Sequence, residues 1–540
     1  MLAKIPGKIS MSAPDITDAE VAAVNQVLAS NTLSIGPRLV EFEEKLASYV
    51  GVNYAIGVSS GTAGLHLCMI AEGVGENDLV ITPSFSFIAS ANSILYERAA
   101  PIFVDVDPTT GNIDPHQAAE AVHDLMKGGR FAERWLPRTL HGNSEAYRLK
   151  ALLPVHAFGQ PADMDSLLDI ARHYHLSVIE DACEAIGSQY KGRIVGTLGD
   201  SAVFAFYPNK QMTTGEGGMI VTNSNGKANL IRSLRNQGRD VFDAWLNHTR
   251  LGYNYRMDEM SAALGAVQIA RIDELLAKRA EVAQWYHERL KNIEWIDRPI
   301  VTPETTRMSW FVYVIKIKPP FNRDEVMNDL AEVGIPCRPY FTPIHLQPFY
   351  RGKFGYRRGD LPNTEYLGDV SLALPFSSVI TEEQVEYISQ QIKKLESWSG
   401  KVTATEAAKA VGAQAFIAPP PPLQNSSGGT IDTSQELDEI LHSPSRNSWW
   451  NRLLTRHLQY IGDATTGKFI DLFAANHADI GNHRRQWLRQ PGGGHGNRIK
   501  FNGFGGQHDR TRQGRQYSGN QGWAKHERNS CTHPPHADAV

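Results

Sequence analysis

The chain has 540 residues, 41% of them hydrophobic and 21% charged, which is ordinary for a soluble globular protein of roughly two to four domains. Its formal net charge of −4 gives no whole-chain signal for nucleic acid or for a membrane surface. The four cysteines are scattered and form no CxxC pair, so the sequence supports neither a disulfide framework nor a metal site. The first residues lack the apolar core of a secretion signal, and no window approaches about 18 uninterrupted apolar residues. We therefore expect a cytoplasmic protein without a membrane-spanning helix.

Helix and strand patterns alternate through the N-terminal third of the chain. Apolar residues at helical spacing predict helices, and short apolar runs bounded by turn residues predict strands. The predicted helices are 15–28, 39–50, 65–71, 114–125 and 164–175, and the predicted strands are 54–58, 79–83, 101–106, 152–156 and 178–181. This alternation predicts an α/β fold with a largely parallel sheet between two layers of helices.

The loop after the first predicted strand, residues 59–64, consists of small residues and leads into a helix. In such a connection, backbone N–H groups and the amino terminus of a helix can face an anion. The same spacing also fits a plain tight turn, so the loop alone is a weak signal.

A central segment, residues 201–223, reads as strand, lysine, glycine-rich turn and strand. Its one lysine, Lys210, lies in a polar loop before Gly215, Gly217 and Gly218, which permit positive φ angles and close approach of another group. A lysine placed at a sheet edge in this way can be desolvated, which favours the free amine needed for imine chemistry. Taken alone, the segment also fits a solvated lysine beside an ordinary hairpin.

A carboxylate upstream changes this interpretation. Asp181 ends a short β-type run, where a strand gives way to a loop. A lysine paired with such a carboxylate suits a pyridoxal-phosphate site, in which the lysine forms the Schiff base and the carboxylate keeps the pyridinium nitrogen protonated.

The segments EDACEAIGSQYKG and FYPNKQMTTGEGGMIVT resemble the DegT/StrS-type sugar aminotransferases, which are fold-type I enzymes that use pyridoxal phosphate. The resemblance runs from about residue 9 to residue 395. It implies that Lys210 carries the cofactor and that Asp181 pairs with the ring nitrogen. It further implies that Gly61, Thr62 and Ala63 form the cradle for the cofactor phosphate. The Phe87 ring would stack on the cofactor, and Glu184 would lie near its phenolic oxygen.

The resemblance also implies a homodimer with shared active sites. In that family, the residue at the position of Asn254 reaches across the interface to the partner's cofactor phosphate. Within the smaller domain, residues 335–340 and 343–345 resemble a family segment that approaches the substrate, and His345 and Tyr313 are candidate substrate contacts there. His156 precedes a Phe-Gly-Gln-Pro turn, and we interpret it as structural because the family does not need it for chemistry.

Three features depart from the family pattern. Many members have glutamine or histidine where Glu184 stands, and a carboxylate there would have to be protonated or turned away. Members often have serine where Ala205 stands, so a hydroxyl that could touch the phosphate is missing. A polar, basic insertion, residues 127–149, lengthens a connection that is usually shorter; we interpret it as a surface excursion, with a lid over the substrate as the alternative.

Composition and pattern divide the chain into three parts. We predict a large cofactor-binding domain over 1–258 and a smaller α+β domain over 259–399 that begins with a long amphipathic helix, 259–290. Residues 400–540 form a proline- and glycine-rich linker and a low-complexity tail, in which short helices can occur. Arginine and glycine with interspersed aromatics can bind single-stranded nucleic acid, but we do not expect that partner here.

The activity that the resemblance implies is a ping-pong transamination. An amino donor, glutamate in most of the family, gives its amino group to a keto-sugar that is usually nucleotide-linked, and the product is an amino-sugar for a polysaccharide or glycoside. Two alternatives remain open. A dehydratase or isomerase on the same fold is one, although sister dehydratases have histidine at the position of Lys210. A non-catalytic binding or regulatory protein that acts through its basic tail is the other.

Overall fold

The computed structural model describes residues 7–240 and 247–395. The linker and tail predicted for residues 400–540 lie outside the described residues. Within the described part, no helix combines the length and the apolar character that crossing a membrane requires.

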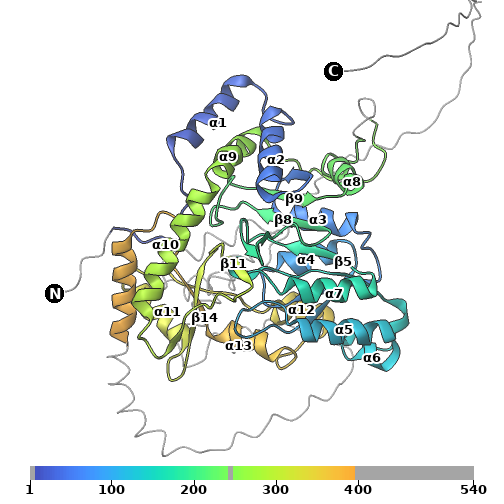
Figure 1. The fold of residues 1–540 in the computed structure, drawn as a ribbon. Helices are drawn as coiled ribbons and strands as arrows, with labels where there is room; N and C mark the ends of the chain where they lie inside the picture. The colour runs from blue at the N-terminus through green and yellow to red at the C-terminus, as the bar shows by residue number, and fades with distance from the viewer. Residues whose placement is uncertain (1–6, 241–246, 396–540) are drawn as a thin grey trace, which may run out of the picture. The chain divides into compact units, whose positions relative to one another are not determined.

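A seven-stranded mixed sheet forms the centre of the large domain (Figure 1). Its order is β1-β9-β8-β5-β4-β2-β3, and only β9 runs antiparallel to its neighbours, which are β1 and β8. The segment around Lys210 thus forms the predicted antiparallel pair. The strands are β1 (Tyr54–Val58), β2 (Asp78–Pro83), β3 (Ala100–Val104), β4 (Arg148–Leu152), β5 (Ser177–Asp181), β8 (Ser201–Ala205) and β9 (Gly218–Thr222).

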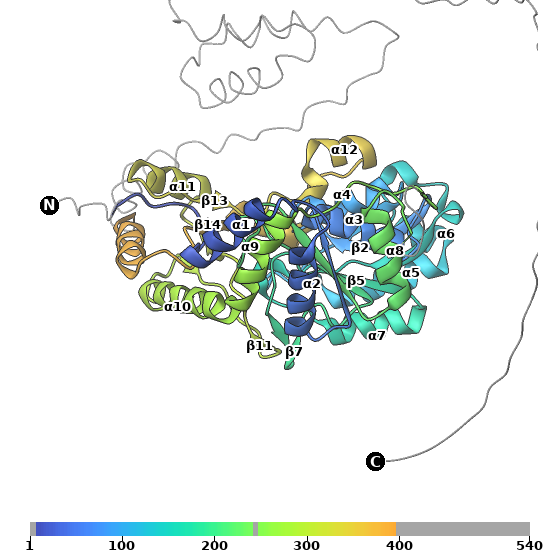
Figure 2. The same ribbon diagram turned by 90° about the horizontal axis from the view of Figure 1, so that it is seen from above.

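Side chains alternate between the two faces of this sheet, as a strand dictates. On β8, Ala202 and Phe204 enter one hydrophobic core, whereas Val203 enters the core on the opposite face. Figure 2 shows α3 and α4 on one side of the sheet and α5 and α7 on the other. The helices of this domain are α1 (Asp18–Ser30), α2 (Pro37–Val50), α3 (Gly61–Ala71), α4 (Ala89–Tyr96), α5 (Pro115–Lys127), α7 (Met164–Tyr174) and α8 (Asn225–Arg235). This is the predicted α/β arrangement with helices on both faces.

Two predicted boundaries in the large domain are wrong. The helix predicted from residue 65 begins at Gly61, because the Ser60 side chain accepts a hydrogen bond from the Ala63 N–H and caps the first turn. The strand predicted at 152–156 is β4, Arg148–Leu152, which begins within the insertion. Pairing with β2 sets its position, and Arg148 Nε donates to Asp78 Oδ1 at 2.8 Å.

The helix predicted at 259–290 is also wrong, because it is two helices, α9 (Glu259–Ala270) and α10 (Ile272–Leu290). The break lies at Arg271, whose φ of −104° and ψ of 6° leave the helical region. Its guanidinium donates to Asp15, Glu20 and Glu274, so the break is anchored to the segment that leads into α1. In Figure 1, α9 lies beside α1 and α2, and α10 continues away toward the smaller sheet.

The smaller domain has a four-stranded sheet of order β10-β12-β14-β13. Its core includes Val282 and later residues of α10, together with Ile9, whereas Leu275 and Leu276 pack in the large-domain core. Its elements are β10 (Ile296–Asp297), β12 (Tyr313–Ile317), α11 (Arg323–Glu332), β13 (Arg338–Pro339), α13 (Pro362–Val370), β14 (Ser371–Leu374) and helical residues 382–395. A separate three-stranded sheet pairs β6 (Gln189–Tyr190) with β7 (Arg193–Ile194) and β11 (Thr305–Arg307).

The insertion folds into α6 (Gly129–Glu133) and two short 3-10 turns before β4. It docks on the segment that follows α12 (Pro348–Phe354). There Arg138 donates two hydrogen bonds to the Asp360 carboxylate and one to the Gly355 carbonyl.

Candidate active site

A cavity of about 570 Å³ opens where the parallel strands of the large sheet end. Open α/β sheets place ligands at this edge. Residues from five strand ends line it: Ser60 after β1, Ser86 after β2, Val155 after β4, Asp181 at the end of β5 and Ala205 at the end of β8. The volume is typical of a small-molecule or cofactor pocket.

Lys210 projects into this cavity from the loop between β8 and β9. Its side chain is 13% exposed, its Nζ lies 3.3 Å from Glu184 Oε1, and the Phe311 ring centroid is 3.9 Å from Nζ. A nearly buried amine that faces a cavity is in a position to react with a carbonyl compound bound there.

Asp181 lines the same cavity and is 5% exposed. Each carboxylate oxygen already accepts one hydrogen bond: Oδ2 from the Ser90 hydroxyl at 2.7 Å, and Oδ1 from the Cys183 N–H at 3.2 Å. Ser90 is held in turn by the Ser86 hydroxyl at 2.9 Å. The carboxylate is thus fixed in orientation, and each oxygen keeps a further lone pair for a donor in the cavity.

The amino terminus of α3 also faces the cavity. Ser60, Gly61 and Thr62 line it, and the N–H groups of a first helical turn have no intrahelical acceptor. A Cβ on Gly61 would lie 2.7 Å from the Ala205 Cβ, so only glycine allows α3 to approach β8 this closely. An anion such as a phosphate fits this end of the cavity. Ala63 lies just behind, buried, with its N–H held by Ser60.

Glu184 is turned into the cavity. Its Oε2 accepts the backbone N–H of Phe158 at 3.0 Å, and its Oε1 faces Lys210. Burial raises the pKa of the Glu184 carboxyl, although the positive charge of Lys210 opposes the shift. The sequence-based alternative that this side chain is turned away is therefore wrong.

Phe87 lines the mouth of the cavity and is 62% exposed, so its ring is free to pack on a bound ligand. Asn254 does not line the cavity of its own chain. It is exposed and forms an isolated backbone bridge with Asn236. His156 is likewise absent from the lining, as expected for a structural residue: its Nδ1 accepts the Ala162 N–H and its Nε2 donates to Glu180.

The two candidate substrate contacts lie in the protein interior. Tyr313 is fully buried in the core of the smaller domain, and its hydroxyl contacts His287 Nδ1 at 2.9 Å. His345 is fully buried between Ser84 and Glu365. Neither lines the cavity, so the structure does not bring them to the site. The Tyr313 hydroxyl and both ring nitrogens of His345 have hydrogen-bond partners within the fold. Sequence spacing does not reveal such partners.

Four residues at the site escaped the sequence analysis. Ser90 orients Asp181, and Phe158 holds Glu184 through its backbone. Phe311 and Tyr340 supply aromatic walls, and burial raises the pKa of Tyr340 to about 12, so its hydroxyl stays protonated. Serines at helix starts and aromatics near strands are common, so sequence offered no signal for Ser90, Phe158 or Phe311. Tyr340 belongs to the segment 335–340, which resembles a substrate-approaching part of the family, although the residue itself is not among the predicted contacts.

The residues present fit pyridoxal phosphate. One cavity brings together an amine, an oriented carboxylate and a helix amino terminus, and the absence of a side chain at Gly61 lets that helix pack closely on β8. The Asn209 side-chain oxygen is buried at this cavity without a partner in the described structure, which leaves an acceptor for a ligand. Among the described residues, no group of three or more His, Cys, Asp and Glu side chains is arranged to hold a metal ion.

Comparison with known proteins agrees with this geometry. The family model of the DegT/DnrJ/EryC1/StrS aminotransferase family matches residues 14–393. GDP-perosamine synthase of Caulobacter vibrioides is 38% identical over 385 residues, which is 71% of this chain and 96% of that protein. The spore coat polysaccharide biosynthesis protein SpsC of Bacillus subtilis is 33% identical over 398 residues, again 71% of this chain and 96% of that protein.

Solved structures give the same result. DesV of S. venezuelae has a TM-score of 0.63 and 30% identity, covering 72% of this chain and 98% of that one. TlmJ of Streptoalloteichus hindustanus has a TM-score of 0.64 and 30% identity, covering 72% of this chain and all of that one. With a fold-type I architecture and a cavity that fits pyridoxal phosphate, this chain belongs to the DegT/DnrJ/EryC1/StrS family and is a pyridoxal-phosphate-dependent sugar aminotransferase.

Proposed function

We propose that this protein transfers the amino group of glutamate to a keto-sugar that is linked to a nucleoside diphosphate. The observation that carries the proposal is the convergence of Lys210, Asp181 and the α3 amino terminus on one cavity. Two relatives whose names specify a GDP-linked product, the GDP-perosamine synthases of Caulobacter vibrioides and Escherichia coli O157:H7, support a nucleotide-linked substrate.

When bound, pyridoxal phosphate supplies a carbonyl for amines and a ring that withdraws electrons. Gly61, Thr62 and Ala63 would hold its phosphate, Phe87 would pack on its ring, and Asp181 would accept a hydrogen bond from its ring nitrogen. Lys210 has two roles, first as the amine that binds the cofactor and then, once released, as the base that moves the proton from the donor's Cα.

Glu184 holds the Lys210 amine before the reaction begins. A buried carboxyl with a raised pKa accepts a proton more readily than an exposed one, so it can take the proton that Lys210 must lose before its amine attacks. Its contact with the Phe158 N–H fixes the direction of that transfer. With the cofactor in place, the same carboxyl would lie near the phenolic oxygen.

We further propose a homodimer in which Asn254 completes the partner's phosphate site. The side chain is exposed on its own chain and lies outside its own cavity, which leaves it available to a second copy. Mixing Lys210→Ala with Asn254→Ala chains tests this. Shared sites predict that the mixture regains about a quarter of the wild-type activity, since one site per mixed dimer would be intact and half of the dimers would be mixed. Activity no greater than the sum of the separate variants would contradict it.

The substrate experiment uses the full chain with pyridoxal phosphate. GDP-, UDP- and dTDP-linked keto-sugars are each supplied with glutamate, and the formation of 2-oxoglutarate is followed. We expect 2-oxoglutarate and an amino-sugar in equal amounts with one nucleotide class. Loss of water from the sugar without 2-oxoglutarate would favour the dehydratase alternative instead. A protein that binds neither cofactor nor sugar would favour the non-catalytic alternative.

The cytoplasmic location stays a prediction.

A further inference from the structure

A buried arginine lies behind the reactive lysine. Arg279 is 1% exposed, in the middle of the apolar face of α10. Leu275, Leu276, Val282 and Ala283 surround it on that face at helical spacing. A charged residue there is costly unless its hydrogen bonds are made, so it needs a reason.

Three backbone carbonyls surround the Arg279 guanidinium. One terminal nitrogen donates to the carbonyls of Trp310 and Phe311 at 3.2 and 3.0 Å, and the other donates to the carbonyl of Lys210 at 2.8 Å. Among the described residues, no carboxylate pairs with it, and its Nε has no partner. Burial lowers the pKa of Arg279 to about 10, so the guanidinium is still charged at neutral pH.

These contacts belong to a closed series of hydrogen bonds that begins and ends at Lys210. Lys210 Nζ contacts Glu184 at 3.3 Å, and Glu184 accepts the Phe158 N–H at 3.0 Å. The Phe158 carbonyl accepts the Phe311 N–H at 3.1 Å. The Phe311 carbonyl then accepts from Arg279, which donates back to the carbonyl of Lys210. Arg279 thus connects the backbone of Lys210 to the backbone of Phe311, whose ring packs on the lysine amine.

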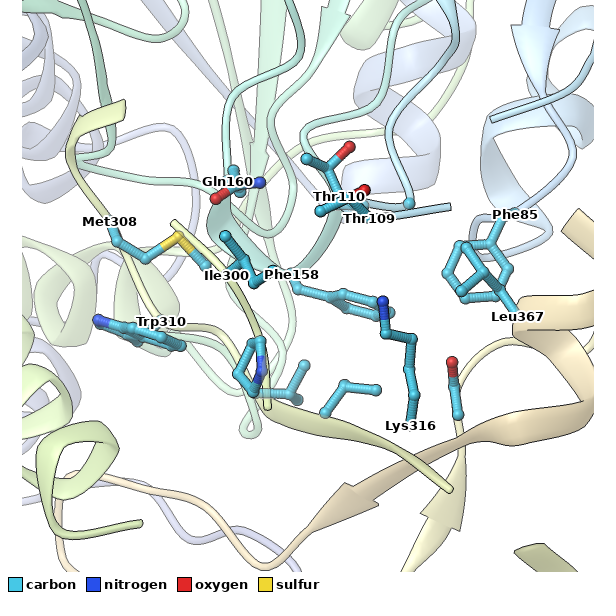
Figure 3. Close-up of a pocket in the computed structure, with 16 residues that line it drawn as sticks. Phe85, Thr109, Thr110, Phe158, Gln160, Ile300, Met308, Trp310, Lys316 and Leu367 are labelled. Atoms are coloured by element: carbon cyan, nitrogen blue, oxygen red, sulfur yellow. The ribbon is translucent and has the colours of Figure 1, made fainter. Parts of the chain in front are cut away.

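A second, small cavity lies on the other side of the segment that carries Phe311. It measures about 50 Å³ and borders residues 310–316, which separate it from the catalytic cavity. Trp310, Val312, Val314 and Lys316 line it, whereas Phe311 lines the catalytic cavity. Figure 3 shows Trp310, Phe158 and Lys316 around this space. Phe311 itself is 1% exposed and packs beside Phe158 and Tyr340, so side-chain packing and the hydrogen bond from Arg279 to its carbonyl both hold it in place.

We propose that Arg279 is a positioning residue for Lys210, which holds the lysine backbone and the Phe311 wall in register so that the amine points into the cofactor cavity. The proposal deepens the proposed function and rests on the role of Lys210 in it. Lysine at position 279 would keep a positive charge but lose the planar fork that reaches three carbonyls.

The test compares Arg279→Lys with Arg289→Lys on the same helix. Arg289 binds Glu382 and Glu386 and lies outside both cavities. The first readout is the rate at which the apoprotein attaches pyridoxal phosphate covalently, over a range of pH, which needs neither glutamate nor a sugar. The second is kcat and KM for glutamate.

We expect Arg279→Lys to attach the cofactor about 10- to 100-fold more slowly, with a shifted pH dependence and a similar fall in kcat at nearly unchanged KM. Arg289→Lys should match the wild type. Wild-type attachment rates in Arg279→Lys would overturn the proposal. Failure of Arg279→Lys to fold, seen by circular dichroism, would assign the residue to stability instead and overturn it too. If the wild type attaches the cofactor but does not use glutamate, the choice of donor fails while this test still stands.

Discussion

The large-domain side of the catalytic cavity supplies the ionisable groups, together with the rings of Phe87 and Tyr207, whereas the smaller-domain side is lined mainly by aromatic rings. Asp181, Glu184 and Lys210 come from the first side, and Phe311 and Tyr340 from the second. The polar groups contact the cavity themselves. On the smaller-domain side, the charged Arg279 and the titratable His345 do not line the cavity.

Two buried residues illustrate this second arrangement. Arg279 contacts the backbone carbonyl of Phe311, and His345 is buried between Ser84 and Glu365 without lining the cavity. In the proposed function, the large-domain side supplies the reacting groups, and the smaller-domain side holds them in position. Substitutions on the first side should therefore alter the reaction, and those behind the second should alter placement or stability.

The largest expected effect is that of Lys210→Ala. In the proposed function this side chain is both the amine that holds the cofactor and the base, so we expect covalent attachment to vanish and kcat to fall at least about 10³-fold. Mass spectrometry after borohydride treatment measures the attachment, and 2-oxoglutarate formation measures the rate. Lys191→Ala is the matched control, since Lys191 is exposed and paired with Asp165. Covalent cofactor on the Lys210→Ala protein would contradict the assignment.

Asp181→Asn should have the next largest effect. Removing the charge that we propose pairs with the ring nitrogen should lower kcat about 10²-fold, a cost comparable with losing one preorganised electrostatic contact. Ser90→Ala removes only the hydroxyl that orients the carboxylate at 2.7 Å, so we expect about a tenfold loss. Both are measured as kcat and cofactor Kd, with Asp165→Asn as the surface control. Equal effects of the two substitutions would remove the distinction between direct contact and orientation.

His345→Leu tests the opposite side through stability. The imidazole is buried, its Nδ1 accepts the Ser84 hydroxyl and its Nε2 donates to Glu365. Losing both hydrogen bonds should lower the free energy of unfolding by about 1–3 kcal/mol. Urea unfolding measures this, with exposed His173→Leu as the control. A large fall in kcat without loss of stability would instead return His345 to the substrate site.

The same histidine predicts a pH dependence. Burial lowers the pKa of His345 below its ordinary value of 6.5, against the opposing charges of Glu365, Asp360 and Asp105. The unfolded chain therefore binds a proton near pH 6.5 that the folded chain does not yet bind. Stability should fall as pH drops through that value, down to the folded pKa. The difference between wild type and His345→Leu, followed by urea unfolding over about pH 5 to 7, should shrink on acidification.

The sequence anticipated the large-domain side well because its chemistry sits on local signals. A carboxylate that ends a strand, a lone lysine before glycines and a small-residue loop before a helix are short-range patterns. Asp181, Lys210 and Gly61 accordingly line one cavity. The same rules placed most helices and strands within a few residues, and they failed where distant partners decide, as at Arg271 and β4.

The opposite side depends on contacts that local patterns do not encode. Tyr313 and His345 are candidates because their part of the chain resembles a family segment that approaches the substrate, yet the side chains of both have partners within the fold. Arg279 is a charged residue on the apolar face of a helix, and it donates a hydrogen bond to the backbone carbonyl of Lys210. Only the tertiary partners of such residues separate the two cases.

The smallest expected effect is that of Arg138→Ala in the insertion. Arg138 is 44% exposed and forms a two-pronged ion pair with Asp360, and no described residue of the insertion lines the catalytic cavity. Surface ion pairs contribute little, so we expect the free energy of unfolding to fall by less than about 1 kcal/mol. KM for the sugar and kcat should stay unchanged if the insertion is a surface excursion. A lid would need the Arg138–Asp360 ion pair in order to close. A severalfold rise in KM with unchanged stability would therefore establish the lid. The cavity would then have a third, movable side.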